Sequence, residues 1–302
     1  MSESMIVFDR ATVRRHRDRA ARGLDTFGFL FDEVADRLAD RLDDVTRSFP
    51  LVADLGGRTG SLARLLTGRK GIETVVTCDI SPAMAAAAPP PAVVCDEEFL
   101  PFAPGSLDLI VSNLSLHWVN DLPGLLVQAR RALRPDGLFL AAMLGGDTLR
   151  ELRDSLAEAE IEGEGGLSPR VSPMADVRDC GGLLQRAGFA LPVVDSDTIT
   201  VTYETPLGLM RDLRGMGESN AVAERRKGFS RRATLLDAAR RYADKHADAE
   251  GRVPATFQII WLTAWAPSAD QPKALKPGSA VTRLEDALKA AEQGLDAPER
   301  KG

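Results

Sequence analysis

Apolar and polar blocks alternate along the first half of the chain with lengths that suit strands and helices in turn. Apolar runs of strand length lie at 51–56 and 73–80, and a segment with helical spacing begins between them at Ser61. This order predicts a β-α-β unit. Two further runs, at 92–95 and 107–112, are nearly continuous, which is typical of parallel strands covered on both faces.

The pattern continues with a helix and a fifth strand. Residues 121–134 have helical spacing and end at Pro135-Asp-Gly137, after which residues 137–143 are typical of a strand. Alternating strands and helices with short connections predict an α/β fold, a doubly wound, mostly parallel sheet with right-handed crossovers. Binding residues are then expected at the carboxyl ends of the strands.

Beyond Gly146 the spacing becomes mostly helical, with two late strands. We expect the runs at 198–203 and 256–265 to extend the sheet at one edge. The segments with helical spacing are 148–161, 175–187, 207–215 and 231–246.

These patterns divide the chain into three predicted parts. They are an N-terminal helical cap over 1–50, a main α/β domain over 51–267 with helical elaboration from about 147, and a loose tail over 268–302. The arginine-rich stretch 10–22 resembles an organelle-targeting peptide, but interspersed acids favour an amphipathic helix that packs on the domain.

Composition and charge narrow the classes of function. The chain has 302 residues, of which 44% are hydrophobic, and a net charge of −6, which argues against non-specific binding to nucleic acid. We expect a cytoplasmic protein without a transmembrane segment, because no apolar run approaches the ~18 to 20 residues that span a bilayer. The three cysteines lack C-x-x-C spacing, so neither a disulfide framework nor a metal site is predicted.

A glycine-rich turn follows the first predicted strand. Gly56, Gly57 and Gly60 would bring backbone amides and a helix N-terminus to a ligand. Their G-G-x-x-G spacing departs from the dinucleotide fingerprint G-x-G-x-x-G and favours S-adenosylmethionine as the cofactor. Arg58 stands where such turns commonly keep a glycine, so its backbone angles must be tolerable and its side chain should point away from the ligand.

Polar side chains follow the next three strands. Asp79 can accept hydrogen bonds from ribose hydroxyls, or alternatively forms an acidic helix start beside Ser81-Pro82. Asp96 and Glu97 can accept from the exocyclic amine of adenine, or are solvated loop acids. Asn113 either lines the methionine portion or forms a turn. The predicted cofactor-binding residues are Asp54, Gly56, Gly57, Gly60, Asp79, Ile80, Asp96, Glu97 and Asn113.

Together these residues resemble the class I S-adenosylmethionine-dependent methyltransferase superfamily. The resemblance sharpens toward the mitochondrial complex I assembly factor 5 family and its bacterial relatives, which are similar to the malonyl-carrier-protein methyltransferases of biotin synthesis. It extends to about Trp265. Few residues precede Phe8, so we expect a bacterial member without a mitochondrial presequence. The segments that carry the resemblance are Phe8-Asp-Arg10, Arg17-Asp-Arg-Ala-Ala21, Asp96-Glu-Glu-Phe-Leu-Pro-Phe102, Ser115-Leu-His-Trp-Val-Asn-Asp-Leu-Pro123, Leu133-Arg-Pro-Asp-Gly137, Gly145-Gly-Asp-Thr-Leu149, Gly215-Met-Gly-Glu-Ser-Asn220 and Val253-Pro-Ala-Thr256.

The resemblance implies three candidate functions. The first is modification of a protein side chain during complex I assembly, either hydroxylation of an arginine on an iron–sulfur subunit of NADH dehydrogenase or methylation. The second is carboxyl methylation of a malonyl carrier protein or small molecule, and the third is a non-catalytic assembly chaperone. The residues themselves supply no iron-binding motif, because His16, His117 and His246 are widely scattered.

Acceptor contacts are expected after the fourth and fifth strands. The candidates for catalysis are His117, Trp118 and Asp147. The alternatives are a single structural hydrogen bond for His117, packing for Trp118 and a helix cap for Asp147-Thr148. The loop that contains Glu218 either covers the substrate or is a plain turn.

Four arginines of the first helix, Arg10, Arg14, Arg15 and Arg17, have two interpretations. They could face an acidic partner. The favoured alternative is a solvated helix face with weak intrahelical ion pairs.

Overall fold

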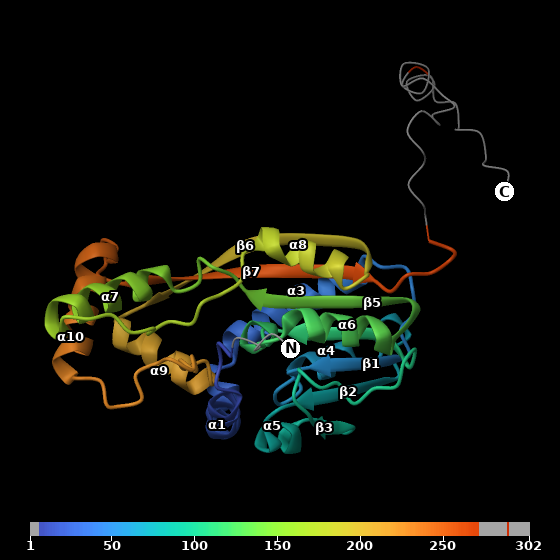
Figure 1. The fold of residues 1–302 in the computed structure, drawn as a ribbon, viewed down its shortest axis with the longest axis horizontal. Coiled ribbons are helices and arrows are strands. Elements are labelled where there is room, and N and C mark those ends of the chain that lie inside the picture. The colour runs from blue at the N-terminus through green and yellow to red at the C-terminus, as the bar shows by residue number, and fades with distance from the viewer. Residues whose placement is uncertain (1–5, 272–288, 290–302) are drawn as a thin grey trace. The chain divides into compact units, whose positions relative to one another are not determined.

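Seven strands form one sheet within the residues that the computed structural model describes, which are 6–271 and 289 (Figure 1). Their order is β3-β2-β1-β4-β5-β7-β6. The first five strands are parallel, whereas β7 is antiparallel to both β5 and β6. The strands are β1 (Leu51–Leu55), β2 (Thr74–Asp79), β3 (Ala92–Val94), β4 (Leu107–Asn113), β5 (Leu133–Leu144), β6 (Ala190–Tyr203) and β7 (Val253–Trp265).

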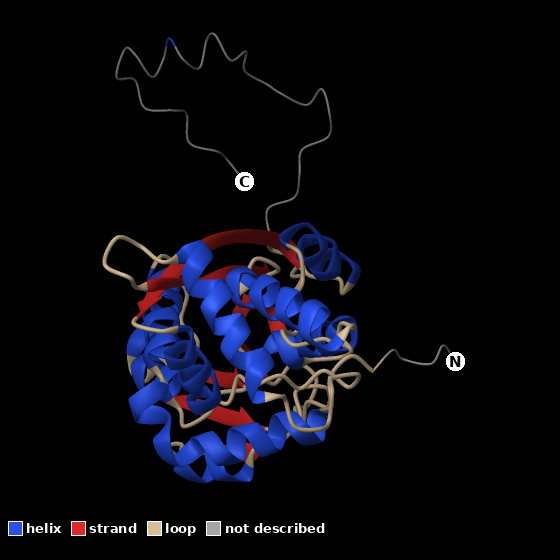
Figure 2. Ribbon diagram, turned by 90° about the vertical axis from the view of Figure 1, so that its left-hand side faces the viewer, coloured by secondary structure: helices blue, strands red, loops and turns tan. Residues whose placement is uncertain are grey.

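Helices cover both faces of this sheet, as the end-on view shows (Figure 2). The predicted doubly wound fold and the edge position of the two late strands are therefore confirmed. The α-helices are α1 (Arg10–Ala20), α2 (Leu24–Phe27), α3 (Phe29–Asp43), α4 (Ser61–Leu66), α5 (Pro82–Ala87), α6 (Leu122–Ala132), α7 (Arg150–Glu164), α8 (Val177–Arg186), α9 (Pro206–Met216) and α10 (Arg232–His246), and the 3-10 turns are η1 (Ala21–Gly23), η2 (Arg69–Gly71) and η3 (Leu116–Trp118).

Successive residues of β5 enter the two core layers in alternation. Leu138 and Leu140 pack with α3 and α4 on one face, while Phe139 and Ala141 pack with α6 and α8 on the other. This is the period of two that a strand imposes on its side chains. The near-continuous apolar run therefore reflects burial on both faces.

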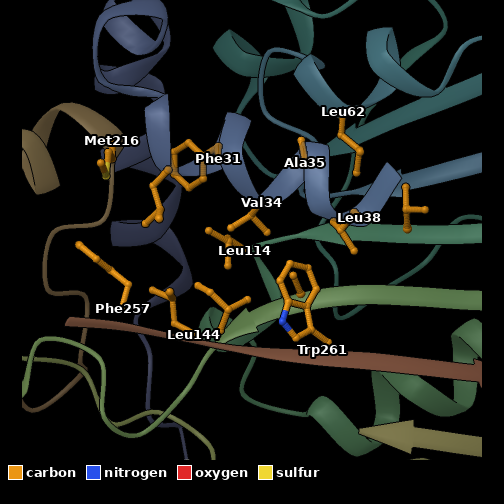
Figure 3. Packing of buried hydrophobic residues seen from close by; sticks show 14 of the residues in the cluster. Phe31, Val34, Ala35, Leu38, Leu62, Leu114, Leu144, Met216, Phe257 and Trp261 are labelled. Carbon is orange, nitrogen blue, oxygen red and sulfur yellow. The ribbon is translucent and has the colours of Figure 1, made fainter. Parts of the chain in front are cut away.

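Helix α3 contributes a continuous apolar stripe to the larger core layer. Figure 3 shows Val34 and Leu38 of this helix among Leu114 and Trp261 from the sheet side. The spacing of the stripe matches one face of a helix. Its buried residues are Leu30, Phe31, Val34, Ala35, Leu38, Ala39 and Leu42.

Several element boundaries differ from the predicted ones; β7, for example, begins at Val253 where residue 256 was expected. β5 begins at Leu133, before the expected start at 137, and Asp136 adopts a positive φ of 65° there. α7 begins at Arg150 because Leu149 has a left-handed backbone. β6 begins at Ala190, eight residues before the predicted start at 198. The earlier part was not predicted because polar residues of this partly exposed edge strand interrupt its apolar pattern.

Among the described residues, no helix has the length and apolar character to cross a membrane. The three cysteines are unpaired. The predicted loose tail lies almost wholly outside the described residues.

Replacement of Leu38 by Ala tests the α3 core face. Leu38 is 1% exposed, so the variant should lose about 2–5 kcal/mol of unfolding free energy through lost burial and the cavity left behind. Urea denaturation measures this loss. The matched control is Leu236→Ala on α10, which is 48% exposed. Equal losses in the two variants would contradict the assignment of α3 to the core.

Candidate functional site

The carboxyl edge of the sheet gathers three acidic side chains and the glycine turn. Asp79 is the last residue of β2, while Asp96 and Glu97 follow β3. Gly56 follows β1 with a φ of +66°, and a Cβ there would lie 2.0 Å from the hydroxyl of Ser115, so only glycine fits. The structure thus brings together residues that the sequence placed after separate strands.

A guanidinium from α1 joins two of these carboxylates. Arg17 Nη1 donates to Asp79 Oδ2 at 2.9 Å and to Glu97 Oε1 at 3.0 Å, and Nη2 donates to Ser115 Oγ at 2.7 Å. The Ser115 hydroxyl also donates to Glu97 Oε1 at 2.6 Å. The Arg17 side chain is only 1% exposed, and Asp79 and Glu97 are fully buried. Buried charges persist only when they are paired, so this network fixes α1 against the strand ends.

Arg10 extends the network from the start of α1. Its Nη2 donates to Asp96 Oδ1 at 2.6 Å and also contacts Glu97, while Nη1 donates to the carbonyl of Trp118 at 3.0 Å. Burial alone would raise the pKa of Glu97, but the positive charges of Arg17 and Arg10 outweigh it and lower that pKa to about 2. Glu97 is therefore a carboxylate at neutral pH.

Neither interpretation of the four arginines holds for Arg10 and Arg17, which bind carboxylates of their own chain. Arg14 does match the solvated alternative, since its side chain is 53% exposed and lies 3.9 Å from Asp18. The error has a physical cause. The acids that pair with Arg10 and Arg17 come from the strand ends, and the helix sequence does not contain them.

Arg58 occupies the glycine turn with a left-handed φ of 52°. Its side chain is buried at the carboxyl edge of the sheet. There it donates to the carbonyls of Asn113 at 2.8 Å and Leu114 at 2.7 Å, and to Glu218 Oε1 at 2.9 Å. The guanidinium also stacks on Phe31 at 3.6 Å from the ring centroid. These contacts offset the strain of a non-glycine residue in this conformation.

Glu218 is the buried carboxylate that forms the ion pair with Arg58. Its Oε2 lies 3.1 Å from His117 Nε2 and accepts from Trp118 Nε1 at 2.7 Å. Burial alone would raise the pKa of Glu218, but the His117 hydrogen bond and the nearby arginines lower it to about 2. Burial lowers the pKa of His117, so a neutral imidazole donates to the carboxylate.

Two cavities flank the ion pair of Arg58 and Glu218. The turn cavity, of about 170 Å3, is bordered by Gly56, Gly57 and Arg58. The outer cavity, of about 450 Å3, is bordered by Glu218 and by apolar side chains of α7 and α9. The ion pair therefore joins the walls of both cavities.

Comparison with known proteins assigns the family. Residues 53–141 match the model of the methyltransferase domain. The arginine hydroxylase NDUFAF5, mitochondrial, of Danio rerio is 45% identical over 294 residues, which cover 95% of this chain and 91% of the relative. The chain belongs to the NDUFAF5 family of methyltransferase-superfamily enzymes.

Other relatives of the NDUFAF5-family chain place it in the wider superfamily. The malonyl-[acyl-carrier protein] O-methyltransferase of Laribacter hongkongensis is 38% identical over 286 residues, which cover 89% of this chain and 94% of the relative. The crystal structure of a candidate methyltransferase from Bacillus halodurans has a TM-score of 0.54 at 15% identity and covers 78% of this chain and 99% of its own. The latter likeness supports the class I methyltransferase fold alone.

The hydrogen-bond acceptors at the carboxyl edge suit S-adenosylmethionine, the cofactor of this superfamily. Asp79 could accept from ribose hydroxyls and Glu97 from an adenine amine, with the turn at Gly56 beside them. In this conformation both carboxylates already bind Arg17 and are fully covered. The chemistry of the residues therefore fits the cofactor, whereas the position of α1 closes the site.

The other predicted site residues lie around this centre. Ile80 is buried beside Asp79, and Asn113 borders the turn cavity and donates from Nδ2 to the carbonyl of Phe31. Asp147 is exposed, and its amide binds Gln258 rather than the His117 cluster. The alternative of a helix cap at Asp147-Thr148 is wrong, since the N-cap of α7 is Leu149 without a side-chain cap. No group of three potential metal ligands occurs within residues 6–271 or at 289.

Sequence reasoning missed Arg17, Ser115 and Phe31 as parts of the site. Arg17 and Ser115 each begin a segment that carries the family resemblance, but Arg17 was expected to face a partner or solvent and Ser115 was given no role. The available signal was electrostatic. Two carboxylates predicted at buried strand ends require a cation, and the first helix is rich in arginine.

Asp54 gives a test of the electrostatics beneath the turn. Both of its carboxylate oxygens are buried without a hydrogen-bond partner, and burial raises its pKa from 3.8 to about 7. Between these values the folded protein holds a proton that the unfolded chain releases, so this group makes wild-type stability fall as the pH rises. Asp54→Asn removes that titration.

The stability of Asp54→Asn relative to wild type should rise by at least about 1.4 kcal/mol between about pH 5 and about pH 7.5. Urea denaturation at the two pH values measures this difference in unfolding free energy. The titration of all other groups is common to both proteins and cancels in the comparison. The matched control is Asp154→Asn on the exposed side of α7. A relative stability that stays constant with pH would show that Asp54 is ionised throughout.

Proposed function

We propose that the chain binds S-adenosylmethionine at the Gly56 turn and modifies an arginine side chain of a partner protein. The proposed partner is an iron–sulfur subunit of respiratory complex I, and the modification is hydroxylation or, failing that, methylation. The name of the Danio rerio relative supports an arginine acceptor. The observation that carries the proposal is the buried carboxylate of Glu218 in the wall of the outer cavity.

The outer cavity suits a long side chain that ends in a cation. Leu152, Leu156 and Met210 supply apolar walls, and Glu218 supplies a charge. Glu218 already binds the guanidinium of Arg58, so its orientation is compatible with this group. Three donors, from Arg58, His117 and Trp118, already bind the Glu218 carboxylate, which has about four hydrogen-bond acceptor positions. One position is therefore left for an N–H group of the substrate arginine.

The residues of this chain would act by binding and orientation. When bound, S-adenosylmethionine supplies an electrophilic methyl group, and methyl transfer depends mainly on proximity and alignment. His117 and Trp118 hold Glu218 in place through Oε2. They are positioning residues in this proposal.

A second candidate is carboxyl methylation of a malonyl carrier protein, as the name of the Laribacter relative suggests. Three arginines that border the outer cavity favour an anionic acceptor. Each of them already has an acidic partner, just as Glu218 has Arg58, so the choice between the two acceptors rests on the product. The pairs are Arg170–Glu160, Arg225–Asp9 and Arg226–Glu164.

The mass of the product distinguishes the candidates. The protein is incubated with S-adenosylmethionine and an arginine-containing fragment of the iron–sulfur subunit, with and without dioxygen plus a two-electron reductant, and in parallel with a malonyl carrier protein. An added oxygen atom that requires both dioxygen and the reductant supports hydroxylation, in which the second oxygen atom leaves as water. An added methylene group identifies methylation of whichever acceptor carries it. Cofactor binding without any mass change would support a chaperone instead.

Substitution of Gly56 tests the cofactor site itself. A Cβ at this position would clash with Ser115, so Gly56→Ala should weaken S-adenosylmethionine binding at least tenfold, about 1.4 kcal/mol. Isothermal titration calorimetry measures the change. Gly68→Ala is the matched control, since Gly68 has a φ of +84° with nothing near its Cβ position. Equal binding by the two variants would remove the turn from the proposed site.

A further inference from the structure

We infer that α1 is a removable cover over the cofactor site and that Arg17 and the cofactor's nucleoside are alternative partners of Asp79 and Glu97. Cofactor entry then requires α1 to leave the strand ends. The inference rests on the proposed function, since it takes S-adenosylmethionine to be the ligand of this edge. The inference adds that Arg17 of the same chain competes with this ligand for Asp79 and Glu97.

The acceptor positions of the two carboxylates are nearly filled. Asp79 accepts from Arg17 Nη1, from the Arg58 amide at 3.1 Å and from the Ser81 amide at 2.8 Å. Glu97 accepts from Arg17, Ser115 and Arg10. With about four positions per carboxylate, a ribose that brings two hydroxyl donors needs the place of Arg17.

Space leads to the same conclusion. The turn cavity of about 170 Å3 is smaller than the about 300–1,000 Å3 of typical ligand pockets. Gly56 borders this cavity, and a Cβ on Gly56 would also meet Ser115 and Glu97, which hold Arg17. Arg17 does not border the cavity itself, and Gly56 separates the cavity from the residues that hold the guanidinium. Withdrawal of Arg17 would join the cavity to Asp79 and Glu97.

Charge favours exchange with a cationic ligand. Arg17 pairs with both Asp79 and Glu97, so its withdrawal removes one positive charge from beside two buried carboxylates. S-adenosylmethionine has a sulfonium, an ammonium and a carboxylate, and its net positive charge replaces that of Arg17. A neutral nucleoside such as adenosine provides no such replacement. The ion pairs of this network are Arg17 with Asp79 and Glu97, Arg10 with Asp96, Glu97 and Glu98, and Arg58 with Glu218.

The side chain of Arg17 cannot leave while α1 stays in place. It is 1% exposed, and its Cα would lie 3.5 Å from a Cβ on Gly217 at the end of α9. On its other side α1 contacts α5, where Asp18 accepts from the Ser81 hydroxyl. Figure 1 shows α1 next to α5 and α9. Release of the guanidinium therefore moves the helix as a unit.

Calorimetric titration of S-adenosylmethionine into the full-length protein tests the competition. Arg17→Met should bind at least tenfold more tightly than wild type, because the apparent Kd of wild type is raised by the small fraction of open protein. Arg14→Met, on the exposed side of the same helix, should leave the Kd unchanged. Arg17→Lys keeps the charge with fewer donors, and it provides a folded variant of intermediate affinity if Arg17→Met is unstable.

Hydrogen exchange of the wild-type protein gives a second readout. Saturating S-adenosylmethionine should speed exchange of the amides over 10–20 at least tenfold, and adenosine should not. Unchanged or slower exchange at saturation, or equal Kd values for wild type and the Arg17 variants, would contradict the inference that α1 is a cover. The proposal that the protein binds S-adenosylmethionine would still stand. If neither wild type nor any Arg17 variant binds S-adenosylmethionine, the proposed function fails and the cover fails with it.

Discussion

The burial of Arg17 between Asp79 and Glu97 is the interaction on which the carboxyl edge of the sheet depends. Parallel strands deliver both carboxylates to one enclosed place, where two unpaired negative charges would repel each other and lose their hydration. The cation that compensates them belongs to α1. The position of α1 thus depends on the two carboxylates at the strand ends. Arg17, which stabilises these carboxylates, also shields them from solvent.

Arg58 shows what a glycine turn requires when it lacks one glycine. A non-glycine residue with a left-handed backbone costs about 1–3 kcal/mol. A hydrogen bond to a charged group returns about 1.5–3 kcal/mol, and Arg58 makes several. The balance depends on Glu218, which lies 160 residues further along the chain. The loop after α9 is therefore part of the turn's stability as well as of the outer cavity.

The central strands could be predicted from the sequence because burial on both faces permits few polar interruptions, as in β1 and β4. The edge strand β6 was recognised only in part, since half of its side chains face solvent and Asp195 and Asp197 interrupt the pattern. The gathering of Asp79, Asp96 and Glu97 followed from topology, because parallel strands end at one edge. Their cations could not be predicted in the same way, because the charge pattern of α1 is also typical of a solvated helix.

His16 and Arg17 are neighbours on α1, yet they serve different parts of the site. Arg17 binds the strand-end carboxylates, while His16 borders the outer cavity and lies 3.1 Å from the carbonyl of Ser219. If α1 is the cover, a ligand that packs against His16 holds this helix on the strand ends and opposes entry of the cofactor. Neighbouring residues of one helix would then couple the outer cavity to the strand-end carboxylates.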